Sequence, residues 1–94
     1  MLMFASVLAG CGDSDVSAIK GAVKERLIDP DSVKFGSTRI GEAGVEACIE
    51  YNAKNRMGGY GGQKVAYASK SPEGWKVRDM DKHPDFCPIS GKTY

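Results

Sequence analysis

The sequence predicts an α+β fold in which one N-terminal helix packs on an antiparallel meander of three to four strands, held by one disulfide. Three observations support this prediction. Apolar residues recur at helical spacing before Pro30 and alternate with polar residues after it. Turn-forming residues separate the alternating segments. The chain has 94 residues, which is enough for a single small domain.

The helix is expected over residues 16–27. Its apolar positions are spaced by three and four residues, which places them on one helical face. We expect the helix to stop near Ile28, because Pro30 disfavours helical geometry in the residue before it. Residues 12–15 are polar and are expected to form a short tether. The predicted apolar face consists of Val16, Ile19, Val23 and Leu27.

Strands are predicted where the apolar period changes to two. Gly-containing turns at 41–44 and 71–74 separate successive strands, and the second has Pro and Gly where a β-turn favours them. The helix would cover one face of the resulting sheet. The tail over 79–94 contains two prolines and is expected to be irregular. The predicted strands are 36–41, 45–53, 63–70 and 74–79.

The first ten residues predict a signal peptide. They contain no charged side chain, whereas all 13 basic and 12 acidic residues follow Cys11. The apolar run at 2–9 is too short to span a bilayer, which needs about 20 apolar residues, but it has the length of a signal-peptide core. The alternative is a short N-terminal strand or helix that packs in the core.

Cys11 is the candidate lipidation site. The preceding Leu-Ala-Gly has the form of a lipobox, in which small residues enter a peptidase and the thiol accepts diacylglycerol. Acyl chains such as palmitate would then hold the protein on a membrane. This interpretation gives a lipidated Cys and tether at 11–15 and a domain at 16–94 in the bacterial cell envelope, facing the periplasm. The alternative is an unmodified Cys that follows Gly by chance.

Cys48 and Cys87 then remain as one pair, which in an oxidising compartment predicts a disulfide. Such a bridge contributes about 3–4 kcal/mol in the chain-entropy model. A metal site is the alternative. It would add the single histidine, His83, but a fourth ligand is lacking, so we expect no metal and no cofactor.

A glycine-rich segment at 52–62 is the most unusual part of the sequence, with four glycines in five positions. Its spacing fits neither common phosphate-loop pattern. One interpretation is a contact loop with two cations, a thioether and an aromatic ring. The other is a structural hairpin in which asparagines bond the turn and the tyrosine packs on the sheet. The candidate binding residues are Lys54, Arg56, Met57 and Tyr60.

No residue pattern predicts catalysis. Glu46 and Glu50 would share one strand face, but such pairs are far more often part of a solvated face than a catalytic carboxylate pair. The net charge of +1 does not indicate a nucleic-acid partner. We therefore expect no catalytic residues and a protein that is not an enzyme.

Two motifs carry a resemblance to a known family. They are Asp-Pro-Asp-Ser-Val-Lys-Phe at 29–35, and Cys-Ile-Glu-Tyr-Asn-Ala-Lys-Asn at 48–55 followed by Gly-Gly-Tyr at 58–60 and by Gly62. Through them the chain resembles, over about residues 16–70, a widespread family of small bacterial and phage-encoded lipoproteins. It departs from the family pattern at Ile49, where the family usually has Gly. The resemblance implies lipoprotein class and envelope location, and it implies no mechanism.

These observations favour a membrane-anchored envelope lipoprotein that binds another envelope protein without catalysis. Envelope assembly, or superinfection exclusion by a phage-encoded protein, would fit that interpretation. The alternative is a periplasmic inhibitor of a cell-wall hydrolase of the lysozyme type, with the loop at 54–60 entering the enzyme cleft. A small enzyme is the least favoured hypothesis.

Overall fold

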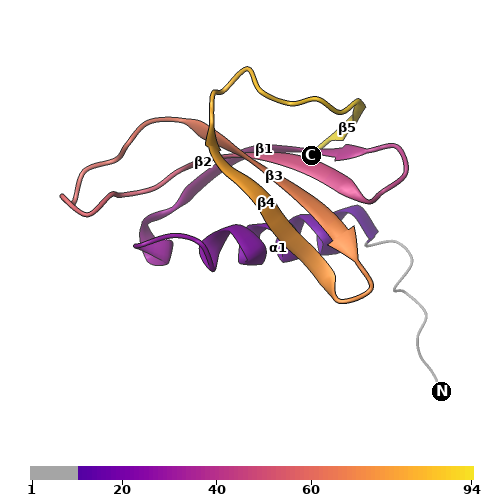
Figure 1. Ribbon diagram of the computed structural model, residues 1–94, viewed down its shortest axis with the longest axis horizontal. Helices are drawn as coiled ribbons and strands as arrows, with labels where there is room; N and C mark the ends of the chain where they lie inside the picture. Colours follow the sequence, from indigo (N-terminus) through magenta and orange to yellow (C-terminus); the bar gives the residue numbers. More distant parts are fainter. Residues whose placement is uncertain (1–10) are drawn as a thin grey trace.

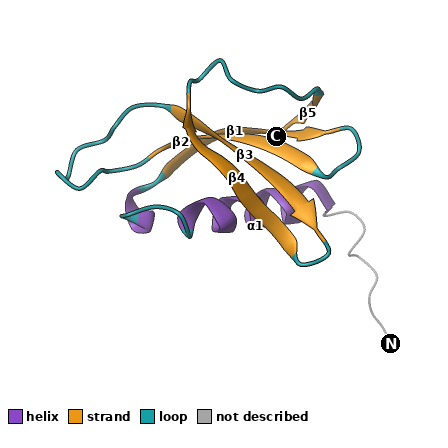
Figure 2. Cartoon of the chain, viewed as in Figure 1, coloured by secondary structure: helices purple, strands orange, loops and turns teal. Residues whose placement is uncertain are grey.

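The computed structural model describes residues 11–94, with side chains from Ser14 onward, as a sheet with a helix on one face (Figure 1). The predicted signal peptide lies outside the described residues. The C-terminal segment crosses the other face of the sheet (Figure 2). Within residues 11–94, no helix is long and apolar enough to cross a membrane.

The sheet has five strands, and every neighbouring pair is antiparallel. Their order is β4-β3-β2-β1-β5, so the first four strands form the predicted meander. The α+β class is confirmed, but the strand number is five rather than three to four. The strands are β1 (Lys34–Gly41), β2 (Glu46–Asn52), β3 (Lys64–Ser71), β4 (Gly74–Lys82) and β5 (Gly91–Thr93).

Strand β5 corrects the prediction that the tail is irregular. It pairs with β1, and the main chains of Thr38 and Tyr94 exchange hydrogen bonds of 3.1 and 2.7 Å. The two strands approach closely at Gly91, where a methyl group would overlap the carbonyl oxygen of Ile40. Three residues are too few for an alternating pattern to be recognised, which explains why the sequence did not predict this strand.

Helix α1 spans Cys11–Lys24, so it begins and ends earlier than the apolar spacing predicted. The residues expected as a tether, 12–15, are helical. At the C-terminal end, the amides of Arg26 and Leu27 donate to carbonyls three residues back, at 2.9 and 3.2 Å. Such bonds tighten the last turn and end the α-helix. A 3-10 turn, η2 (Pro30–Ser32), then leads into β1.

The core lies between α1 and the inner face of the sheet. Ile19 and Val23 of the helix are fully buried, as is Ile49 at the centre of β2. Around Ile49 the sheet presents small side chains, which leave space for the helix. Trp75 belongs to the edge strand β4 and closes this side of the core, and its indole N–H donates to Asp15 at 3.2 Å. The small side chains around Ile49 belong to Ala47, Ala66 and Ala68, none of which has any exposed surface.

Cys48 lies on the outer face of the sheet, between two β2 residues that face the helix. It forms the predicted disulfide with Cys87, with a Cα–Cα distance of 5.9 Å and a sequence separation of 39 residues. The bond ties the C-terminal segment across the outer face before that segment returns to form β5 (Figure 2). In the chain-entropy model it stabilises the domain by about 3–4 kcal/mol.

The buried hydroxyl of Thr38 allows the packing on the inner face of the sheet to be tested. Its side chain is 1% exposed, and its hydroxyl has no hydrogen-bond partner among the described residues. Because an unpaired buried hydroxyl is costly, Thr38→Val should raise the free energy of unfolding by about 1 kcal/mol in urea denaturation. Thr93→Val, on exposed β5, is the matched control and should change little. A loss of stability in Thr38→Val would contradict this account of the core.

Candidate functional site

The hairpin between β2 and β3, residues 53–63, extends beyond the end of the sheet (Figure 1). Its arms meet at a bridge between Lys54 and Tyr60. At the tip, the side-chain oxygen of Asn55 accepts the amides of Met57 and Gly59 at 2.9 and 3.4 Å. Gly58 adopts a φ of +86°, a conformation that glycine adopts at little cost. The tip is therefore a hydrogen-bonded turn.

The base of the hairpin is fastened to η2. The Tyr60 hydroxyl donates to the Ser32 carbonyl at 2.9 Å, and the Lys54 amide donates to the Ser32 hydroxyl at 3.0 Å. Asn52 accepts the Gly62 amide at 3.1 Å. The predicted role of the asparagines in the turn is confirmed. The same interpretation expected Tyr60 to pack on the sheet, whereas its hydroxyl bonds η2 and 41% of its surface is exposed.

The four candidate binding residues lie along this hairpin and are all exposed. Met57 occupies the tip, with 92% of its surface accessible. The ammonium groups of Lys34 and Lys54 lie 4.8 and 5.9 Å from the centre of the Tyr60 ring. Among the described residues, neither lysine nor Arg56 lies within 4.0 Å of a carboxylate. The hairpin therefore presents unpaired positive charge around an exposed apolar side chain.

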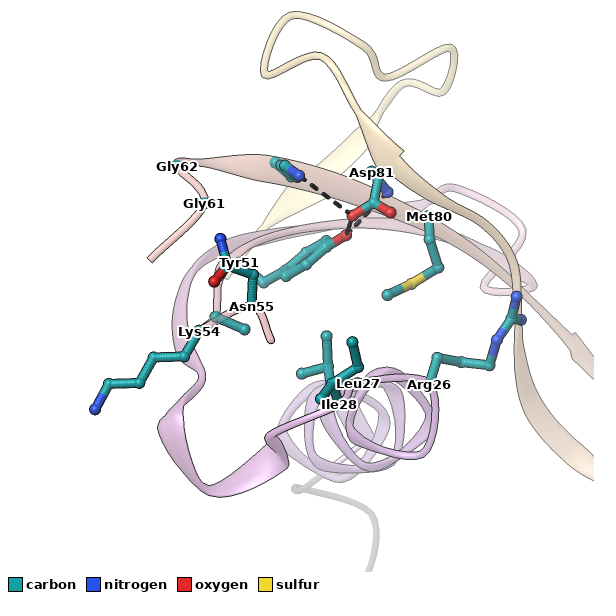
Figure 3. A pocket seen from close by; sticks show the side chains of 12 residues that line it. Arg26, Leu27, Ile28, Tyr51, Lys54, Asn55, Gly61, Gly62, Met80 and Asp81 are labelled. Carbon is teal, nitrogen blue, oxygen red and sulfur yellow. Dashed lines mark hydrogen bonds and ion pairs between the residues drawn. The ribbon is translucent and has the colours of Figure 1, made fainter. Parts of the chain in front are cut away.

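A cleft of about 350 Å³ lies beneath the base of the hairpin (Figure 3). The segment that follows α1 forms one wall, the hairpin base another, and the end of β4 a third. Its apolar surface comes from Leu27, Ile28 and Met80, together with the ring of Tyr51. No pattern in the sequence predicted this cleft. The remaining lining residues are Arg26, Ala53, Lys54, Asn55, Gly61, Gly62, Lys64 and Asp81.

Tyr51 and Asp81 form the polar part of the cleft. The Tyr51 hydroxyl donates to the Asp81 carboxylate at 2.6 Å and accepts the Asp81 amide at 2.9 Å. The Lys64 ammonium lies 3.7 Å from the same carboxylate. Asp81 adopts a φ of +60°, which is uncommon for a residue other than glycine. The tyrosine thus holds the end of β4 in a conformation that the chain alone disfavours.

The environment of Tyr51 favours its neutral form. Burial raises the pKa of the Tyr51 hydroxyl above its ordinary value, and the hydrogen bond to Asp81 raises this pKa further. Tyr67 is a contrasting case on the outer face. There the pKa of the hydroxyl is raised chiefly by its 2.7 Å hydrogen bond to Glu46.

The two glutamates noted in the sequence serve separate contacts on the outer face. Glu46 accepts from Tyr67, whereas Glu50 accepts the amide and hydroxyl of Ser37 at 3.2 and 3.1 Å. His83 is exposed in the C-terminal segment, with its Nδ1 3.7 Å from Asp85. Among the side chains that the structure describes, from Ser14 onward, no group of three or more His, Cys, Asp or Glu is arranged to hold a metal ion.

Comparisons of the chain with protein-family models, curated proteins and solved structures returned no match.

The Tyr51 contact predicts a pH-dependent loss of stability. Tyr51→Phe should lower the free energy of unfolding by about 1–3 kcal/mol at pH 7, because both hydrogen bonds to Asp81 are lost. Since the hydroxyl keeps its proton more strongly when folded, its contribution is complete below about pH 10 and declines above it. Urea denaturation from pH 7 to 11 should therefore show the two proteins converging as pH rises.

The matched control is Tyr67→Phe, which removes a hydroxyl from the outer face and should cost less than about 1 kcal/mol. A difference between wild type and Tyr51→Phe that stays constant up to pH 11 would contradict the assigned environment of Tyr51.

Proposed function

We propose that this chain is a membrane-anchored envelope lipoprotein that acts by non-catalytic protein binding through the hairpin at 53–63. The observation that carries the proposal is the tip itself, where Met57 is 92% exposed although hydrogen bonds order the turn around it. Met, Arg and Tyr are enriched at protein interfaces. An ordered segment also loses less conformational entropy when it binds, which favours affinity.

The position of the hairpin relative to Cys11 supports a protein partner. Helix α1 begins at Cys11, and the hairpin lies beyond the end of the sheet at which this helix terminates (Figure 1). A helix of 14 residues is about 21 Å long. If Cys11 carries the lipid, the domain begins at the membrane surface and presents the hairpin away from it. Envelope assembly and phage-encoded superinfection exclusion both require such a contact.

A second candidate function is inhibition of a cell-wall hydrolase of the lysozyme type. The observation that favours it is the narrow shape of the hairpin combined with its unpaired cations, Lys54 and Arg56. Glycoside hydrolases commonly work with two carboxylates that flank the bond to be cleaved. A basic projection complements such a cleft in charge.

A photo-crosslinking amino acid at position 57 tests the proposal in intact cells. We expect one reproducible protein adduct, because the exposed tip is the contact surface. The matched control is the same amino acid at position 45, where Val45 is 47% exposed in the turn at the other end of β2. Absence of an adduct at 57, or the same adducts at both positions, would contradict the proposal. A cell-wall hydrolase as the adduct would favour the second function.

A further inference from the structure

We propose that the cleft beneath the hairpin binds a segment of the partner protein in which an apolar side chain is flanked by carboxylates. This inference rests on the proposed protein-binding function and names the chemistry of the partner. The cleft is lined by both arms of the hairpin, at 53–55 and at Gly61 and Gly62, so a protein that contacts one surface reaches the other.

The apolar floor of the cleft comes from segments that are far apart in the sequence. Leu27 and Ile28 follow the helix, and Met80 lies near the end of β4 (Figure 3). Ile28 is 65% exposed, so much of this apolar surface faces solvent in the free protein. A volume of about 350 Å³ is at the lower end of the range for ligand sites. It suits a bulky side chain with its adjoining backbone.

The charged residues around the apolar floor favour acidic residues on either side of the apolar side chain of the partner. Three cationic residues line the cleft, Arg26, Lys54 and Lys64, against a single acidic residue, Asp81. Asp81 is already paired with Lys64, which leaves the other two cations without a carboxylate within 4.0 Å among the described residues. Lys54 extends outward from the mouth of the cleft in Figure 3. Carboxylates at the rim would therefore gain both Coulombic attraction and charge-assisted hydrogen bonds.

A second copy of this chain is a poor occupant of the cleft. The protruding element that would enter it is the hairpin, which carries Lys54 and Arg56 and contains no acidic residue. Insertion of this hairpin into a cleft whose charged residues are three cations and one carboxylate would bring like charges together, which opposes association. An acidic segment from a different protein has the complementary charge.

The walls of the cleft are fixed before binding. The Tyr51–Asp81 contact holds the end of β4, and Ser32 holds the base of the hairpin through two hydrogen bonds. Arg26 is held in place by a 3.1 Å hydrogen bond to the Val77 carbonyl. A site with fixed walls binds a short segment at a lower entropic cost than one that must become ordered.

The test is a titration of the ¹⁵N-labelled full chain with blocked tripeptides, followed by NMR. The probe is Glu-Leu-Glu, and the controls are Lys-Leu-Lys and Glu-Ser-Glu. We expect the first peptide alone to shift the amides of Leu27, Ile28, Gly61 and Gly62, and added salt to weaken the effect. Equal shifts with all three peptides, or shifts confined to the outer face, would overturn the proposal.

Two pairs of variants sharpen the result. Lys54→Glu should weaken binding of Glu-Leu-Glu about fivefold, whereas Lys76→Glu should leave it unchanged, because Lys76 is an exposed residue of β4 that does not line the cleft. Ile28→Ser should weaken it by a similar factor, whereas Val45→Ser should not, because Val45 is also exposed but lies in the distant turn between β1 and β2. Loss of binding in both members of either pair would overturn the assignment to the cleft.

The experiments distinguish failure of the cleft assignment from failure of the proposed protein-binding function. A protein adduct at position 57 with no peptide binding in the cleft would retain the proposed function and overturn the cleft assignment. Vesicles containing phosphatidylglycerol provide the third arm. If they shift the cleft amides and Glu-Leu-Glu does not, the surface recognises lipid, and the assignment to an acidic protein segment is overturned.

Discussion

The structure depends on the contact between helix α1 and the inner face of the sheet. Ile19 and Val23 of the helix and Ile49 of the sheet are completely buried, and three alanines around Ile49 leave space for the helix to approach. Because interiors are close-packed, this arrangement fixes the position of the helix across the sheet. The sheet edge, the outer face and the hairpin are all placed relative to this one contact.

The outer face is held in a different way. The Cys48–Cys87 disulfide ties the C-terminal segment to the centre of the sheet, and β5 then completes the edge beside β1. A domain of this size buries a modest fraction of its surface and has a small margin of stability. A contribution of about 3–4 kcal/mol from the bridge is therefore a large share of that margin. On the outer face, a covalent bond rather than a packed helix holds the covering segment against the sheet.

The sequence predicted the features that depend on local patterns. Helical spacing located α1, alternation located four strands, and the glycines located the hairpin. The rest depends on contacts between distant residues. Tyr51 and Asp81 are 30 residues apart, and Tyr60 reaches Ser32 across 28 residues. The cleft combines three such segments, so no stretch of sequence contains its pattern. Strand β5 depends on the close approach at Gly91, which also has no local signal.

In our account, one end of the molecule serves for membrane anchoring and the opposite end for binding a partner. The helix begins at Cys11, and the basic hairpin with its cleft lies where the helix ends. A protein anchored at the first end would present the second to partners in the envelope. The fixed hairpin and cleft walls suit recognition of a surface, whereas the disulfide suits an oxidising compartment.

The central claim is anchoring at Cys11, and the intact mass of the protein from a bacterial membrane fraction tests it most directly. The measurement is made with and without reduction. Our account predicts a chain that begins at an acylated Cys11 and gains two hydrogens on reduction of the Cys48–Cys87 bond. An unmodified chain that retains Met1 and has free thiols would contradict it.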